Sequence, residues 1–148
     1  MSDASTDLLT AVDGLLHEET QVHDTGIDLT VSEVSVVDEA GRVDFGGGEL
    51  EPARMRSHET RKRRPEDDYE WWHLDSGTYL LTYNESLATD RPLLLQTREA
   101  VLERGASHPT RVVTSLPRMP LSVSDGGLYL KENARVSTLR PYSAQSGR

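Results

Sequence analysis

The sequence contains no cysteine, which excludes disulfide bonds, thiolate metal sites and cysteine nucleophiles. It has no apolar run of membrane-spanning length, and its first residues, MSDASTDLLTAVDG, carry acids where a secretory signal carries bases. We therefore expect a soluble, cytoplasmic protein with no membrane partner. At 148 residues the chain fits one domain, which can bury a core without cross-links.

Lysine is also scarce, because only Lys62 and Lys131 are lysine among the 16 Lys and Arg residues. The 25 acidic residues bring the net charge to -9. An acidic chain with little lysine resembles proteins of salt-accumulating microbes, whose carboxylates keep surfaces hydrated. The alternative is an acidic protein from a GC-rich genome, and both interpretations stay open. Either way, the negative balance predicts no nucleic-acid partner, because phosphates are attracted by a positive field.

Short apolar segments separated by turn residues dominate the chain after residue 25. GIDLTVSEVSVV alternates, then changes phase, which predicts one strand with a bulge or two strands with a bend. RVDF, between glycines, is expected to be a short strand. Further strands are predicted in WWHLDSGTYLLTYNESL, RPLLLQ, TRVVTSL, MPLSVS, GLYLKE and ARVSTLRP. Short, closely spaced strands with glycine turns predict an all-β barrel or jelly roll.

Four segments can be distinguished along the chain. Residues 1–20 form an N-terminal helical segment, in which an amphipathic helix over Asp3–His17 is interrupted at Gly14. Residues 21–140 form the β domain, and residues 141–148 a short tail. Within the domain, residues 51–70 are read as a charged loop whose basic run is answered by the acidic run beside it.

Three motifs, in order, resemble the dUTPase and dCTP deaminase superfamily. GIDLTV (Gly26–Val31) is similar to its G-x-D-L strand, and LDSGTYLLTYNESL (Leu74–Leu87) to its L-x-P-G-x-Y/F strand. TREAVLERGA (Thr97–Ala106) occupies the place of its P-R-S-S-L-x-x-x-G phosphate-binding turn. A weaker match, ENARVSTL (Glu132–Leu139), resembles the late strand with its G-x-R-I/V-A-Q core.

The resemblance implies a dUTPase-like distorted jelly roll, or β-clip, with one or two short helices. It further implies a homotrimer with active sites between subunits, pyrimidine deoxynucleoside triphosphates as substrates, and Mg²⁺ carried on the phosphates. Asp28 matches the aspartate that lies near the metal's water shell, which makes it the candidate for metal contact through water and for catalysis. The alternative places Asp28 on the exposed face of an amphipathic strand.

The phosphate turn supplies the remaining candidates for substrate binding. Arg98 matches the arginine of the motif, and a guanidinium suits phosphate oxygens bidentately. Arg104 matches its basic closing position, while Thr97 is expected to be a helix N-cap and Gly105 the residue that ends the helix. The alternative is a capped two-turn helix with a surface arginine.

The motif departs from the family where two serines are expected, because Glu99 and Ala100 follow Arg98. Alanine cannot donate to a phosphate oxygen, and at about 4 Å with an effective dielectric near 20, like charges cost on the order of 4 kcal/mol. The segment G-x-I-D-x-G-Y-x-G, which carries the hydrolytic aspartate in dUTPases, is missing as well. Residues 104–131 contain no glutamate and one carboxylate, Asp125, in an SDGG turn. The late strand has Thr138 in place of the family glutamine.

Three functions therefore remain open. The first is a dUTP diphosphatase, which releases dUMP and pyrophosphate. The second is a dCTP deaminase, which needs a glutamate that the segment lacks. The third is a catalytically inactive nucleotide sensor or interaction protein. The five histidines show no paired metal-ligand spacing, and His108 is read as an exposed loop residue rather than a site residue.

Overall fold

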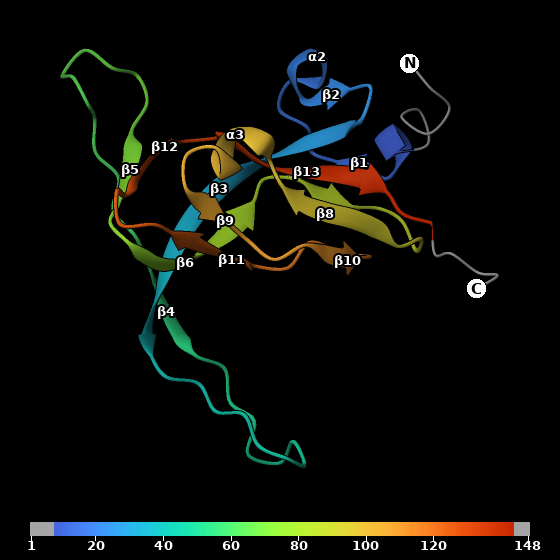
Figure 1. Ribbon diagram of the computed structural model, residues 1–148, viewed down its shortest axis with the longest axis vertical. Helices are drawn as coiled ribbons and strands as arrows, with labels where there is room; N and C mark the ends of the chain where they lie inside the picture. The colour runs from blue at the N-terminus through green and yellow to red at the C-terminus, as the bar shows by residue number, and fades with distance from the viewer. Residues whose placement is uncertain (1–7, 144–148) are drawn as a thin grey trace.

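The computed structural model describes residues 8–143, and its framework is antiparallel β-sheet (Figure 1). Residues 8–10 are helical, and two further short helices are α2 (Glu18–Gln21) and α3 (Glu99–Leu102). The strands are β1 (Val12–Asp13), β2 (Val22–His23), β3 (Gly26–Glu39), β4 (Arg54–Ser57), β5 (Trp71–Leu74), β6 (Gly77–Tyr83), β7 (Ser86–Leu87), β8 (Leu93–Thr97), β9 (Ala106–Ser107), β10 (Arg111–Val113), β11 (Met119–Val123), β12 (Leu128–Lys131) and β13 (Arg135–Pro141).

In the described part of the chain, nine strands form one curled sheet in the order β10-β8-β13-β3-β6-β11-β9, with β2 and β4 also paired to β3. Two small ribbons, β1–β7 and β12–β5, complete the fold. This arrangement confirms the predicted all-β class with short helices. The core contains fully buried residues from β3, β6, β8, β11 and β13, namely Ile27, Leu29, Val31, Leu81, Leu95, Met119, Leu121, Val136 and Leu139.

The long strand β3 joins the two halves of the sheet. Its first half pairs with β13, and its second half pairs with β6 and β4. The register shifts between Val31 and Glu33, so the predicted bulge is present and the strand is continuous. The bulge changes which side chains face the core, which is why the sequence alternation changes phase there.

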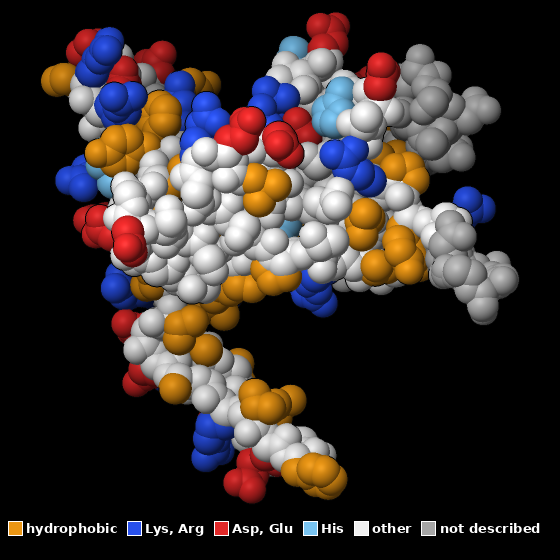
Figure 2. Space-filling view, viewed as in Figure 1, with side chains coloured by type: hydrophobic (Ala, Val, Ile, Leu, Met, Phe, Trp, Pro, Cys, Tyr) orange, Lys and Arg blue, Asp and Glu red, His pale blue; other side chains and the backbone are white. Residues whose placement is uncertain are grey.

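Beyond the sheet, β3 and β4 extend into an arm, residues 38–56, that projects from the body (Figures 1 and 2). The prediction of a strand at RVDF, residues 42–45, is wrong. This part of the arm forms one isolated β-bridge, between Arg42 and Glu51. Near its tip Phe45 is 108% exposed and Val43 is 89% exposed. The reading of residues 51–70 as a plain loop is also wrong at β4, which pairs with β3 as an edge strand.

The helix predicted over residues 3–17, with an interruption at Gly14, is only a short turn over residues 8–10 in the described part of this range; residues 3–7 of the prediction lie outside the described residues. This turn ends before β1, and Gly14 adopts a positive φ of 86°. Buried Gln21 holds the N-terminal segment to the sheet: its side-chain amide donates to the Asp28 carbonyl oxygen and to the Glu85 carboxylate. No helix in residues 8–143 is long and apolar enough to cross a membrane.

Candidate functional site

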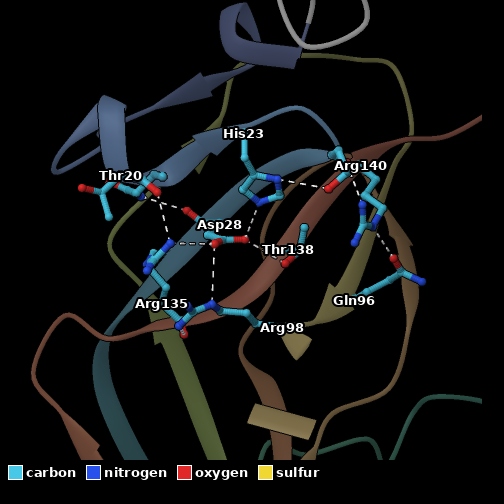
Figure 3. Close-up of polar contacts among 10 residues, drawn as sticks. Thr20, His23, Asp28, Gln96, Arg98, Arg135, Thr138 and Arg140 are labelled. Atoms are coloured by element: carbon cyan, nitrogen blue, oxygen red, sulfur yellow. Dashed lines mark hydrogen bonds and ion pairs between the residues drawn. The ribbon is translucent and has the colours of Figure 1, made fainter. Parts of the chain in front are cut away.

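Asp28 is the centre of a polar cluster at the start of β3 (Figure 3). Its Oδ1 accepts hydrogen bonds from Thr138 Oγ1 at 2.8 Å and from His23 Nε2 at 3.0 Å. Its Oδ2 accepts one from Arg135 Nη1 at 3.1 Å. The residue is only 4% exposed, so its placement on an exposed strand face is wrong. β3 is covered here on both faces, and a buried carboxylate is stable only with such donors.

Two arginines share this one carboxylate. Arg98, at the junction of β8 and α3, places its Nε 3.6 Å from Asp28 Oδ2, and its Nη1 donates to the Arg135 carbonyl oxygen. Arg135, which begins β13, also donates to the Thr20 carbonyl oxygen. Burial lowers the pKa of Arg98, Arg135 lowers it further, and Asp28 opposes the shift. The pair thus carries one positive charge more than Asp28 neutralises, which suits an anion.

A third guanidinium, that of Arg140, lies beyond His23 and Thr138, away from the arginine pair (Figure 3). Its Nε donates to Gln96 Oε1 at 2.7 Å, and its Nη1 donates to the Thr25 carbonyl oxygen at 2.8 Å. Arg135, Arg140 and His23 were not among the sequence candidates. ENARVSTLRP contains both arginines, but only the pairing of β13 with β3 and β8 places them beside Asp28 and Gln96.

The structure places the other residues of the predicted turn in different roles. Thr97 is buried, and its hydroxyl donates to the His108 carbonyl oxygen and accepts from the His108 amide. Thr97 is therefore not the N-cap, a position that Arg98 occupies without a side-chain cap. Arg104 is exposed and donates to the Ala100 carbonyl oxygen. Gly105 has a φ of 84°, as expected of the residue that ends the helical turn.

Glu99 is exposed to solvent, while Arg98 turns to Asp28. The repulsion expected between this carboxylate and a phosphate is therefore screened by water. Ala100 still provides no donor, so an anion held here would depend on the guanidinium groups rather than on hydroxyls.

A second buried polar network lies behind the cluster. The Tyr83 hydroxyl lies 2.6 Å from Ser137 Oγ, which lies 2.7 Å from His108 Nε2. His108 Nδ1 lies 2.8 Å from the Pro109 carbonyl oxygen. His108 is 6% exposed, so its reading as an exposed loop residue is wrong. Burial lowers the pKa of His108 and raises the pKa of Tyr83 to about 12, so both are neutral near pH 7.

The described residues do not fit a metal ion held by the protein. Within residues 8–143, no group of three or more His, Asp or Glu side chains is arranged so that it could hold a metal ion. Both Asp28 oxygens already accept from strong donors, and two arginines adjoin it. Mg²⁺ prefers oxygen ligands that are free of competing cations. Direct coordination of Mg²⁺ by Asp28 therefore disagrees with the geometry.

Comparison with known proteins finds archaeal relatives that share one name, although no protein-family model matches the chain. A protein of Methanosarcina acetivorans named probable deoxyuridine 5'-triphosphate nucleotidohydrolase is 29% identical over 135 residues, covering 86% of this chain and 75% of the relative. Proteins of the same name from Methanosarcina mazei and Methanococcoides burtonii are 28% and 26% identical, covering 84% and 88% of this chain and 74% and 78% of their own lengths.

Among solved structures, the 2'-deoxycytidine 5'-triphosphate deaminase of Agrobacterium tumefaciens has a TM-score of 0.60 and 12% identity. The similarity covers 95% of this chain and 47% of the deaminase, so the chain spans about half of that protein's length. At this identity the match shows the fold alone. The archaeal relatives in sequence and the deaminase in fold both agree with the resemblance to the dUTPase and dCTP deaminase superfamily.

Proposed function

We propose that the protein is a nucleotide hydrolase that binds dUTP at the arginine pair and converts it to dUMP and pyrophosphate. The observation that carries this proposal is the pair itself, in which Arg98 and Arg135 share Asp28 and retain an excess positive charge. The archaeal relatives named as dUTP nucleotidohydrolases support the choice of substrate.

The geometry suggests how the pair would work. Arg98 contacts Asp28 at 3.6 Å, the longest of the four polar contacts to that carboxylate, and it is the member most readily drawn to a phosphate. Arg135, held by Asp28 and the Thr20 carbonyl oxygen, stays in place and adds charge beside it. Asp28 acts by positioning both guanidinium groups rather than as a general base, because its oxygens are occupied.

Magnesium is proposed to arrive with the triphosphate, whose oxygens supply the ligands that the protein does not. A homotrimer with sites between subunits, located in the cytoplasm, is proposed from the family resemblance. Because every subunit of a homotrimer has the same sequence, a water-activating group contributed by a neighbouring subunit would come from outside residues 104–131.

A nucleotide sensor without catalysis is the second candidate, and one observation favours it. Asp28 is fully engaged, and Asp125, the one carboxylate of residues 104–131, lies in the exposed turn between β11 and β12. A deaminase is less well supported, because the same segment has no glutamate.

The test incubates the purified protein with Mg²⁺ and either dUTP or dCTP at low and high potassium chloride, and separates the products by chromatography. Pyrophosphate from dUTP supports the hydrolase, and dUTP from dCTP supports a deaminase. Binding without turnover supports the sensor, and no binding contradicts the proposed site.

Arg98→Ala should weaken dUTP binding by about 10- to 100-fold, since a charge-assisted pair contributes about 1.5–3 kcal/mol. Arg54→Ala is the matched control, because Arg54 is an exposed arginine paired with Glu39 on the arm. Equal binding by the two variants would remove Arg98 from the site.

A further inference from the structure

The outer ribbon β5–β12 presents an aromatic and basic surface that the proposed function does not use. Trp72, Leu74 and Leu130 point into the core, and the alternate residues face outward. Cross-strand pairing places Lys131 opposite Trp71 and Tyr129 opposite His73. In Figure 2 hydrophobic and charged side chains gather at this end of the molecule, at the upper left.

Two cations of this surface, Arg63 and Lys131, lie on aromatic rings. The Arg63 guanidinium carbon is 5.3 Å from the centre of the Trp71 ring. Lys131 Nζ is 5.1 Å from the Tyr69 ring and 5.7 Å from the Trp71 ring. Such contacts stabilise a cation without neutralising it. We call Arg63, Arg64, Tyr69, Trp71, Tyr129 and Lys131 the aromatic–basic face.

The basic and acidic runs, whose charges were expected to answer each other, lie side by side around one hollow without a direct ion pair among the described residues. Arg63, Arg64 and Lys131 form no ion pair within 4.0 Å in the part of the chain that the structure describes. The neighbouring carboxylates bind other groups, since Asp67 accepts the Arg64 amide and Glu70 accepts the Thr60 hydroxyl. The three cations are therefore not bound in ion pairs, and Asp67 and Asp68 offset only part of their charge.

Two hollows meet at this face. The smaller, of about 150 Å³, is lined by Arg63, Arg64, Asp67, Asp68, Tyr69, Trp71 and Lys131. The larger, of about 480 Å³, shares Tyr69 and Lys131 and adds Leu16, Glu132 and Asn133. Three cations and two carboxylates line the smaller hollow, which leaves it one net positive charge. It has room for a phosphate group, while the larger hollow has room for a planar ring against Tyr69.

We propose that the aromatic–basic face is a second binding site, which takes a nucleotide with its phosphate between Arg63 and Lys131 and its base against Tyr69. Tyr69 is 51% exposed, so a ring can stack on it, and base–aromatic stacking contributes about 1–3 kcal/mol per base. The chemistry is that of a nucleotide unit, which either a free nucleotide or a single strand supplies. The proposal does not depend on dUTP hydrolysis.

The test uses adenine probes, which carry no uracil or cytosine: a fluorescent deoxyadenosine monophosphate and a labelled ten-residue oligodeoxyadenylate. Binding is followed by fluorescence anisotropy at low salt. The double variant Arg63→Gln, Lys131→Gln is compared with Arg42→Gln, Arg54→Gln, which removes the same charge from exposed pairs on the arm. Both substituted residues of the first variant are exposed, so the fold is expected to persist.

The first double variant should bind about tenfold more weakly than the unaltered protein, and the second within about twofold. Arg98→Ala should retain binding. A strand that binds much more tightly than the mononucleotide identifies single-stranded nucleic acid as the source, and similar affinities identify a free nucleotide. Equal binding by the two double variants, loss of binding in Arg98→Ala, or no saturable binding of either probe would overturn the proposal.

Discussion

Replacing Asp28 by Asn tests whether this carboxylate holds the arginine pair together. The amide is nearly isosteric, so packing is retained. One oxygen can still accept from Thr138 and His23, but the NH₂ group then faces Arg135 and Arg98, which are donors themselves. The substitution removes a charge-assisted hydrogen bond and leaves two neighbouring guanidinium groups without their shared anion.

The size of the effect follows from burial. Removing one partner of a buried ion pair costs about 3–5 kcal/mol of stability. The cost for Asp28 should lie at the lower end of this range, because the side chains of Arg98 and Arg135 are 28% and 32% exposed to solvent. We expect the free energy of unfolding to fall by about 3 kcal/mol, which lowers the melting temperature by roughly 6–12 °C. Urea denaturation and thermal unfolding both measure it.

Asp75→Asn is the control, because Asp75 is exposed and its substitution changes the net charge equally. The measurement is repeated at low and high potassium chloride, since salt screens exposed pairs strongly and a buried carboxylate weakly. A loss below about 1 kcal/mol, or one no larger than that of the control, would refute the role given to Asp28.

Two further predictions concern buried polar groups. Burial lowers the pKa of His108, so the unfolded chain binds its proton first; stability should be complete above about pH 6.5 and fall as the pH drops below it. Urea midpoints at pH 7.5 and 5.5 should show this loss, and a loss just as large in His108→Gln would assign it to other groups. Glu85→Gln should lower the free energy of unfolding by about 1–3 kcal/mol. Both carboxylate oxygens of Glu85 accept hydrogen bonds from Thr30 or Gln21, so the NH₂ group of glutamine would face another donor. Its measure is chemical denaturation, and an unchanged midpoint would contradict the network.

Much of the fold could be predicted, because alternation and turn residues act locally. Tyr79, Leu81 and Tyr83 point inward from β6 as their spacing predicts. The N-terminal segment could not be predicted in this way, since Gln21 fixes it by contacts with β3 and with Glu85, which lies 64 residues away. Helical spacing says nothing about such partners.

The candidate site was predictable only in part. The motifs contain Arg98 and Asp28, but no local pattern shows that the two share a contact or that Arg135 joins them. These contacts form because β13 pairs with β3, which brings Arg135 to Asp28 although the two lie 107 residues apart in the sequence. The prediction of Thr97 as a helix N-cap failed for the same reason. Its hydroxyl is hydrogen-bonded to the backbone of His108, which lies between β9 and β10.

The bulge of β3 separates two tasks that one strand performs. Before it lie Asp28 and the pairing with β13; after it lie the pairing with β6 and the projecting arm. The side-chain partners of Asp28 all lie outside the arm, so a change in the length of the arm should leave the orientation of Asp28 as it is. The contacts that hold the arginine pair thus depend on the first part of β3, and the arm can be shortened or lengthened without touching them.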